Sequence, residues 1–413
     1  MKVVGFITEY NPFHYGHKYH LDKSLQLTRA THSIAVMSSS FVQRGEPSIV
    51  DKWTKAKIAI ENGVDLVIEL PFVYSTQSAE FFALGGVKVL DSLNIVDYIA
   101  FGSEIGNLEP LTQIADLLLK ETDEFKNSLK KNLDLGMSFP AARSLAIEYS
   151  LKFKGLNSFD YGSILKQSNN ILAIEYLKAL KKIGSSINPI PITRQGSDYK
   201  EETIRETFAS ATAIRKSILA NGIQSIKNLV PDKTYELLQE FYYNHNNFNH
   251  LENYYSVIKY LLLTTHRDDL KEILDMENGL ENRIVEQSLH SINMEELIGN
   301  SSTKRYPKTR IQRILTHLLN SIFGSTIQDI YSKEVPYIRF LGANQKGLEL
   351  LSLIKEKSNI PILTKFSHHE NIKNDIVDQF IYYEKNATDL YYFGLNMKNP
   401  KNMDYKTSPY IKK

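Results

Sequence analysis

The sequence opens with VVGFITEYNPFHYGHKYH, residues 3–20, in which an apolar run leads through a turn-rich loop into a helical pattern. Val3–Phe6 has the length and composition of a buried strand. From about Gly16 to Ala30 the apolar residues recur with the period of a helix. The stretch is therefore predicted to form a strand, a loop and a helix.

The same alternation continues beyond this first unit. Further short apolar runs, each predicted to be a strand, lie at Ser33–Met37, Leu66–Leu70, Tyr98–Phe101 and Pro189–Thr193. Helical patterns at about 51–62 and 77–92 separate the first of them. Short strands that alternate with helices are typical of βαβ units and a parallel sheet, so the predicted fold class is α/β.

The chain of 413 residues has room for two domains. We place the boundary near Ser225, which gives a first domain at 1–225 and a mainly helical second domain at 226–413. Within the first domain, about 108–153 is predicted to be a helical insertion because its pattern is helical and polar. Short apolar runs at 338–341 and 360–363 are expected to add a few strands to the second domain.

Composition excludes several classes of protein. The chain has no cysteine, so it has no disulfide framework and no thiolate site. No apolar run approaches the roughly 18 residues of a membrane span, and the first residues do not resemble a secretory signal. We therefore expect a cytoplasmic protein with no membrane partner. The 49 Lys and Arg against 47 Asp and Glu neither require nor exclude a nucleic-acid partner.

Two segments carry groups that suit phosphate. His14, Gly16 and His17 open the first helix directly after the first strand, where free N–H groups and a partial positive charge face an anion. In SATAIRK, residues 210–216, hydroxyls and a basic pair begin another helix. That second segment is by itself equally typical of a helix cap. A zinc site is disfavoured because histidines at positions 14, 17 and 20 would not converge on one ion, and no metal ligand is predicted.

Together these motifs resemble the nucleotidyltransferase superfamily, and more closely the tRNA(Met) cytidine acetate ligase family. The resemblance extends from Thr8 to about His317 and rests on seven blocks in order: TEYNPFHYGHKYH, SSSFVQRGEPSIVDKW, GVDLVIELPFVYSTQSAEFFALGGV, AFGSE, SNNILAIEYLKAL, SATAIRK and KRYPKTRIQRILTH. It implies a Rossmann-like nucleotidyltransferase domain that is followed by a helical tRNA-binding domain.

The resemblance also implies a two-step reaction. Acetate attacks the α-phosphate of ATP, which gives acetyl-adenylate and pyrophosphate. The N4 amine of the wobble cytidine in elongator tRNA(Met) then takes the acetyl group, which gives N4-acetylcytidine and AMP. ATP is expected to arrive as its magnesium complex, and no tightly bound cofactor is expected.

By this resemblance His14 and His17 are the predicted catalytic residues. The predicted ATP contacts are Ile7, Thr8, Glu9, Tyr10, Asn11, Pro12, Phe13, His14, Tyr15, Gly16, His17, Lys18, Tyr19, His20, Gly102, Asn169 and Arg194. Candidate phosphate contacts are Ser210, Thr212 and Arg215, and Gln43 and Arg44 are candidates for either acetate or tRNA.

One basic segment is predicted to contact the tRNA. Between Leu297 and Gln328 the sequence has five Lys and Arg and no acid, with one tyrosine among the cations. Basic side chains neutralise phosphates, and an aromatic ring can stack on an unpaired base. The predicted contacts are Lys304, Arg305, Tyr306, Lys308, Arg310 and Arg313.

Two other functions remain open on the sequence. A small-molecule adenylyltransferase of the mononucleotide or phosphopantetheine type would share the ATP site. The large region after Ser225 argues for a larger partner. A non-catalytic RNA-binding protein could keep the nucleotide pocket as a switch, although it would not need both phosphate motifs.

Overall fold

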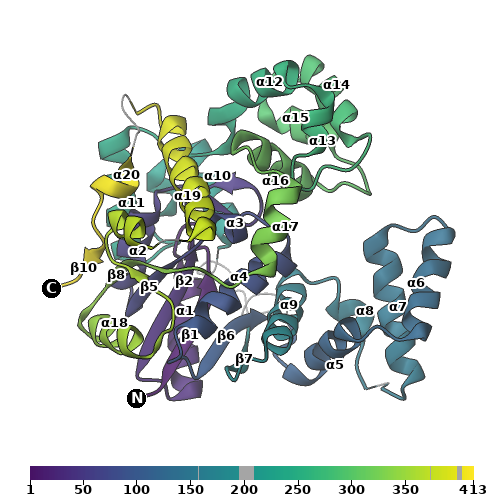
Figure 1. Ribbon diagram of the computed structural model, residues 1–413, viewed down its shortest axis with the longest axis horizontal. Coiled ribbons are helices and arrows are strands. Elements are labelled where there is room, and N and C mark those ends of the chain that lie inside the picture. Colours follow the sequence, from purple (N-terminus) through teal and green to yellow (C-terminus); the bar gives the residue numbers. More distant parts are fainter. Residues whose placement is uncertain (157, 195–208, 373, 398–401) are drawn as a thin grey trace.

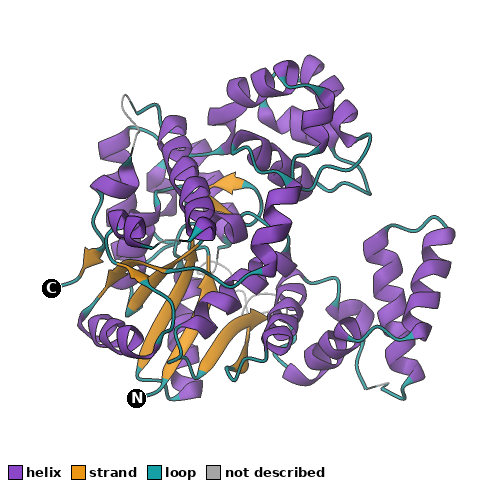
Figure 2. Cartoon of the chain, in the orientation of Figure 1, coloured by secondary structure: helices purple, strands orange, loops and turns teal. Residues whose placement is uncertain are grey.

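The computed structural model describes residues 1–156, 158–194, 209–372, 374–397 and 402–413. An eight-stranded sheet runs through the larger body of the molecule, and helices surround it (Figures 1 and 2). Its parallel strands from the first half of the chain are β1 (Val3–Thr8), β2 (His32–Ser38), β5 (Leu66–Leu70), β6 (Tyr98–Ser103) and β7 (Asn188–Thr193). The predicted α/β fold with a parallel sheet is confirmed.

The order of the strands creates a topological switch point beside β1. The sheet reads β10-β8-β5-β2-β1-β6-β7, so the chain first moves from β1 to β5 and then crosses to β6 on the other side of β1. In parallel sheets a ligand binds outside the carboxyl ends of the strands at such a reversal. The fold therefore places a crevice at the loop that follows β1.

Helices connect the strands of the first half. They are α1 (Tyr15–Thr28), α2 (Lys52–Glu61), α3 (Phe72–Ser75), α4 (Ala79–Ser92), α5 (Leu108–Leu119), α6 (Asp123–Asp134), α7 (Phe139–Phe153), α8 (Tyr161–Ile164) and α9 (Ser168–Ile183). Helices α5–α8 lie between β6 and α9 and project from the body (Figure 1), and α5–α7 occupy the segment of about 108–153. A short hairpin of β3 (Phe41–Val42) and β4 (Glu46–Pro47) occupies a segment that is predicted to be a loop.

The second half of the chain is mainly helical, as predicted. Its helices are α10 (Ala211–Asn221), η1 (Ile223–Ile226), α11 (Asp232–His245), η2 (Leu251–Tyr254), α12 (Tyr255–Thr264), α13 (Arg267–Lys271), α14 (Leu280–His290), α15 (Met294–Ser301), α16 (Lys308–Leu319), α17 (Gly324–Ser332), α18 (Gln345–Lys357), η3 (Phe366–Asn371), α19 (Asp375–Gly394) and α20 (Met403–Lys406). Helices α12–α16 form a lobe beside the body (Figure 1). In the residues that the structure describes, no helix combines the length and apolar character needed to span a membrane.

The last part of the chain returns to the sheet of the first half. Strand β8 (Ile338–Ala343) pairs antiparallel with β5, and β9 (Ile362–Leu363) and β10 (Tyr410–Ile411) pair with β8. The strands expected near residues 338 and 360 are therefore present, and they extend the first sheet. The predicted boundary near residue 225 assigns the α12–α16 lobe to the second domain. It also assigns β8, β9 and β10 to that domain, although these strands belong to the sheet of the first half.

A buried cluster of charged side chains joins this returning segment to the body. Lys52 on α2 lies 2.7 Å from carboxylate oxygens of both Glu69 on β5 and Asp404 on α20. Arg339 on β8 contacts the same two carboxylates, at 3.2 and 2.7 Å. Glu384 on α19 accepts a hydrogen bond from Lys52 at 3.3 Å. All five side chains are at least 95% buried, so each charge depends on its neighbours.

This cluster predicts a pH-dependent difference between the wild type and Glu384→Gln. Burial and the nearby Glu69 carboxylate raise the pKa of Glu384 to about 8, above its ordinary 4.5. A carboxyl whose folded pKa is raised favours folding below about pH 4.5, and that contribution disappears as the pH rises through about 8. Denaturant unfolding at pH 5, 7 and 9 should show the wild type losing stability relative to the glutamine variant. A constant difference would contradict the raised pKa of Glu384.

Candidate functional site

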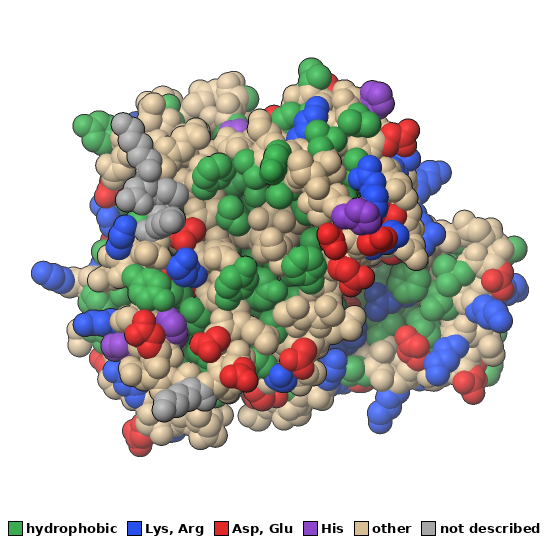
Figure 3. Space-filling view, turned by 45° about the horizontal axis from the view of Figure 1, so that its top comes forward, with side chains coloured by type: hydrophobic (Ala, Val, Ile, Leu, Met, Phe, Trp, Pro, Cys, Tyr) green, Lys and Arg blue, Asp and Glu red, His purple; other side chains and the backbone are tan. Residues whose placement is uncertain are grey.

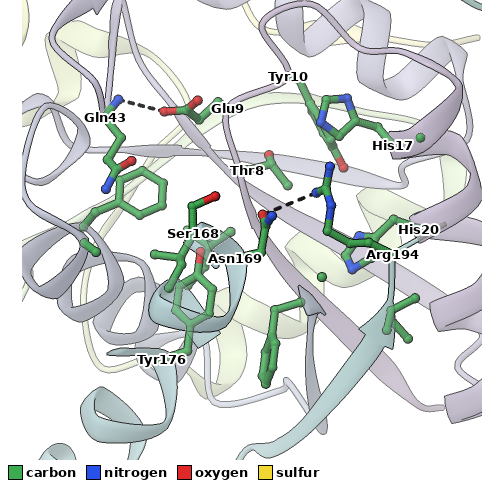
Figure 4. Close-up of a pocket in the computed structure, with 18 of the residues that line it drawn as sticks. Thr8, Glu9, Tyr10, His17, His20, Gln43, Ser168, Asn169, Tyr176 and Arg194 are labelled. Atoms are coloured by element: carbon green, nitrogen blue, oxygen red, sulfur yellow. Dashed lines mark hydrogen bonds between the residues drawn. The ribbon is translucent and has the colours of Figure 1, made fainter. Parts of the chain in front are cut away.

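A cavity of about 600 Å³ lies at the predicted crevice. The carboxyl ends of β1, β6 and β7 form its floor, and the amino ends of α1 and α9 form its sides (Figure 4). Among the described residues it is lined by Ile7, Thr8, Glu9, Tyr10, His14, Gly16, His17, Tyr19, His20, Gln43, Arg44, Ala79, Phe82, Ala100, Phe101, Gly102, Ser168, Asn169, Ile171, Leu172, Tyr176, Ile192, Thr193, Arg194, Thr309 and Arg313.

His14 and His17 are fixed by the start of helix α1. His14 is the N-cap, and its Nδ1 accepts the backbone N–H of Gly16 at 3.0 Å. The Nδ1 of His17 accepts the backbone N–H of His14 at 3.3 Å. The two rings stack with their centroids 3.8 Å apart. This reciprocal capping holds both imidazoles at the positive end of the helix dipole.

Both histidines are neutral donors in this arrangement. Burial and the nearby Arg194 lower the pKa of His14 to about 4, and burial holds the pKa of His17 well below its ordinary value. Because backbone N–H groups occupy each Nδ1, the single ring proton of each neutral histidine is on Nε2. Each ring can therefore donate one hydrogen bond to an anion. A bound polyphosphate would also favour the protonated form of both rings.

Arg194 and Asn169 meet on one side of the cavity, above Gly102. Arg194 Nη1 donates to Asn169 Oδ1 at 3.3 Å, and a Cβ on Gly102 would lie 3.4 Å from Arg194 Cγ. The Glu104 carboxylate accepts the backbone N–H groups of Asn169 and Asn170, at 3.2 and 2.8 Å, and so fixes the start of α9. Three of the predicted ATP contacts therefore lie together on this side of the cavity.

The opposite side of the cavity comes from the β3–β4 hairpin and from α16. Gln43, Arg44, Thr309 and Arg313 line it. Gly45 has a φ of +78°, and a Cβ there would lie 2.4 Å from the backbone nitrogen of Arg313, so only glycine lets the hairpin meet α16. Thr316 donates to the Gly45 carbonyl at 2.9 Å. This contact brings a helix from the second half of the chain to the edge of the cavity.

A buried lysine beneath the cavity was not predicted from the sequence. Lys55 on α2 donates to the carbonyls of Ser38, Ser39 and Glu9, at 2.7, 2.9 and 3.4 Å. Burial lowers its pKa to about 7. It ties together the ends of β1 and β2, where the loops that line the cavity begin. One of three lysines in a predicted helix gives no signal of such a position.

Several residues of the predicted ATP segment support the loop rather than line the cavity. Asn11 accepts the backbone N–H of Ile49 at 2.7 Å, and Phe13 is fully buried in the core. Lys18 pairs with Asp22 at 2.6 Å on the exposed side of α1. Pro12 and Tyr15 are likewise absent from the described lining of the cavity.

The SATAIRK segment lies against the outside of the same loop. Ser210 caps α10 by accepting the Ala213 N–H at 3.2 Å, and Thr212 is exposed. Arg215 donates to the Asn11 carbonyl at 2.8 Å and pairs with Glu46. None of these three predicted phosphate contacts is among the described residues that line the cavity. Arg215 instead braces the loop between β1 and α1.

The basic segment is less positively charged than its sequence indicates. Arg305 and Arg310 pair with Glu277 at 2.7 and 2.8 Å, and Arg313 pairs with Asp275 at 3.2 Å. Tyr306 donates to Glu277 at 3.0 Å. The fold thus supplies acids that lie outside the basic segment in the sequence. Figure 3 shows basic and acidic side chains interleaved on the α12–α16 lobe. Lys304 and Lys308 remain exposed.

No group of three or more His, Asp or Glu within the described part of the chain could hold a metal ion. In particular, His14, His17 and His20 do not converge on one point. The ring of His20 instead packs edge-on against Phe6, at 5.4 Å between centroids.

The predicted contact of Arg194 with ATP has a measurable consequence. Arg194→Ala is expected to raise the KM for ATP about 10–100-fold, because a charge-assisted hydrogen bond of this kind contributes about 1.5–3 kcal/mol. ATP–pyrophosphate exchange in the presence of acetate measures this KM. Arg267→Ala, an exposed arginine on α13, is the matched control and should leave the KM unchanged. An unchanged KM in Arg194→Ala would contradict a contact with ATP.

Comparisons with known proteins identify the family of this chain. The family model of the HIGH nucleotidyl transferases matches residues 1–407. The tRNA(Met) cytidine acetate ligase of Thermoanaerobacter sp. (strain X514) is 45% identical over 408 residues, which cover 98% of each chain. The ligase of the same name from Clostridium novyi (strain NT) is 42% identical and is covered completely.

Solved structures of similar fold extend over the whole chain. The crystal structure of Thermotoga maritima TmcAL bound with alpha-thio ATP has a TM-score of 0.91 and 32% sequence identity, and the match covers 100% of this chain and 99% of that one. The apo form of the same protein has a TM-score of 0.93 and 33% identity with the same coverage. The chain belongs to the tRNA(Met) cytidine acetate ligase family, within the HIGH nucleotidyl transferases.

Proposed function

We propose that this protein is an ATP-dependent ligase that acetylates N4 of the wobble cytidine of elongator tRNA(Met). It activates acetate as acetyl-adenylate with release of pyrophosphate, and then transfers the acetyl group to the cytidine with release of AMP. The observation that carries the proposal is the pair of stacked histidines at the start of α1, which line a cavity in a chain related over its full length to such ligases.

The first step requires donors rather than a covalent nucleophile. When acetate attacks the α-phosphorus, negative charge grows on the phosphate oxygens and on the leaving pyrophosphate. The Nε2–H groups of His14 and His17 and the amino end of α1 are already oriented, so they stabilise that charge without reorganisation. Arg194, Asn169 and Gly102 hold the nucleotide on the neighbouring side.

ATP enters this reaction as its magnesium complex, and acetate is the acyl donor. The metal would lower the charge of the phosphates, and no residue of this chain is assigned to it. Gln43 and Arg44 remain candidates for contact with acetate or tRNA, because both line the side of the cavity that faces α16. Because the proposed substrate is a tRNA, the proposed location of the reaction is the cytoplasm.

Helix α16 connects the cavity with the surface that we assign to tRNA. Thr309 and Arg313 line the cavity, and the exposed Lys304 and Lys308 lie just before them in the sequence. An anticodon loop offers bases that leave the stack, which a paired cytidine does not. The target base can therefore reach the cavity while its phosphates lie along the amino end of α16.

The test is incubation of the purified protein with ATP, isotopically labelled acetate and total bacterial tRNA, followed by mass spectrometry of the nucleosides. Labelled N4-acetylcytidine is the expected product. Acetyl-adenylate without modified tRNA would retain the ATP site and contradict the RNA substrate. The absence of both products would favour a small-molecule adenylyltransferase.

A further inference from the structure

One carboxylate stands out in the wall of the cavity. Among the described residues that line it, Glu9 is the only acidic one. A carboxylate in a site for a polyanionic nucleotide weakens binding, because like charges repel more strongly where water is excluded. Its presence therefore calls for a role other than holding the phosphates.

The position of Glu9 separates it from the histidines. Its Oε1 accepts the backbone N–H of Gln43 at 2.7 Å, which orients the carboxylate toward the β3–β4 hairpin (Figure 4). Its Oε2 accepts no hydrogen bond from the described residues. Lys55, beneath it, donates to the Glu9 carbonyl, and the positive charges of Arg44 and Arg313 line the same side of the cavity. The negative charge of Glu9 favours the charged form of Lys55 and so opposes the burial that lowers the pKa of that lysine, whereas Arg313 is already paired with Asp275.

The other titratable groups in the wall are poorly suited to accept a proton from a substrate. In His14 and His17 the Nδ1 atoms are occupied and Nε2 carries the proton. The Nε2 of His20 is buried, so a substrate cannot reach it. Burial raises the pKa of Tyr10 and of Tyr176 above the ordinary phenol value, so both stay protonated. Among the carboxylate and imidazole side chains of the described lining, Glu9 is left as the accessible acceptor.

We propose that Glu9 is the general base of the acetyl-transfer step. The proposal rests on the function proposed above. The lone pair of the cytidine N4 forms a bond to the acetyl carbonyl carbon, and a proton of N4 passes to Glu9 Oε2. The bond between the carbonyl carbon and the phosphate oxygen then breaks, and AMP leaves with that electron pair. The products are the neutral amide, AMP and a protonated Glu9, which returns its proton to water.

Glu9→Gln separates this role from ATP binding, because glutamine is of the same size and its amide oxygen can still accept the Gln43 N–H. Transfer is measured in a single turnover: acetyl-adenylate is first formed from ATP and labelled acetate in the presence of pyrophosphatase, and tRNA is then added. Transfer should slow by about 10²–10³-fold, the range of general base catalysis. ATP–pyrophosphate exchange with acetate should change by less than about tenfold.

Two controls accompany this variant. Glu80→Gln removes an exposed carboxylate next to the cavity-lining Ala79 and should leave both half-reactions unchanged. Glu9→Asp keeps the carboxylate at a shorter reach and should transfer at an intermediate rate. Thermal unfolding of each variant establishes that it is folded before rates are compared.

The outcomes distinguish the proposals. If the wild type catalyses neither ATP–pyrophosphate exchange nor acetyl transfer, the proposed function is overturned. If the wild type is active and Glu9→Gln transfers the acetyl group at the wild-type rate, the role of Glu9 is overturned and the proposed function stands. Equal losses in both half-reactions would also overturn it, because Glu9 would then act on ATP, for example through the magnesium ion.

Discussion

Replacing His14 with asparagine is expected to lower the rate of ATP–pyrophosphate exchange by about 10²–10³-fold, the usual effect of removing one preorganised donor from a site of developing charge. Asparagine is a good N-cap, so it can still accept the backbone N–H that His14 accepts from Gly16. It cannot reach the position of the imidazole Nε2. The stability of the protein should therefore change little while the first half-reaction is lost.

A second cap provides the control for this variant. Thr122 caps α6 in the helical insertion by accepting the Phe125 N–H at 3.4 Å. Thr122→Ala should cost about 0.5–2 kcal/mol in stability, as loss of a cap does, and should leave the exchange rate unchanged. If His14→Asn kept the wild-type rate, the donor role of the ring would be wrong and the residue would serve only to begin the helix.

Lys52→Met is expected to have the largest effect on stability, a loss of about 3–5 kcal/mol. Methionine has nearly the volume of lysine, so packing is retained. The variant leaves the buried carboxylates of Glu69 and Asp404 with Arg339 as their only cation in the cluster. Urea unfolding followed by circular dichroism measures this loss. Fluorescence is unsuitable because the single tryptophan, Trp53, lies 5.2 Å from the Lys52 ammonium group.

Lys57→Met is the matched control, because Lys57 lies on the same helix and its side chain is one-third exposed. Its ion pair with Glu240, at 3.2 Å, is of the kind that contributes about 0–1 kcal/mol. Equal losses in the two lysine variants would mean that the effect comes from helix α2 itself and not from the buried cluster.

The sequence predicted the parts of the fold that depend on local pattern. The strands and helices around β1 and α1 follow from apolar period, and the histidine pair follows from its place between them. The predicted strand at Leu66–Leu70 matches β5 in both bounds. These features are decided within about 20 residues of chain, so periodicity is sufficient to find them.

Features that depend on distant pairs were not predictable in this way. The antiparallel pairing of β8 with β5 requires contact between segments that lie far apart in sequence. The acids that neutralise the basic segment, Asp275 and Glu277, come from the loop between α13 and α14. The burial of Lys55 depends on carbonyls at the ends of two strands. In each case the deciding partner is supplied by tertiary structure.

The late position of β8 in the chain has a consequence during synthesis. At about 5–20 residues per second, roughly 15–50 s pass between translation of β5 and translation of β8. Throughout that interval the edge of β5 has no neighbouring strand, and an unpaired edge is a template for pairing with other chains. The segment from β8 onward therefore covers an edge of the sheet that stays open while the intervening chain is made.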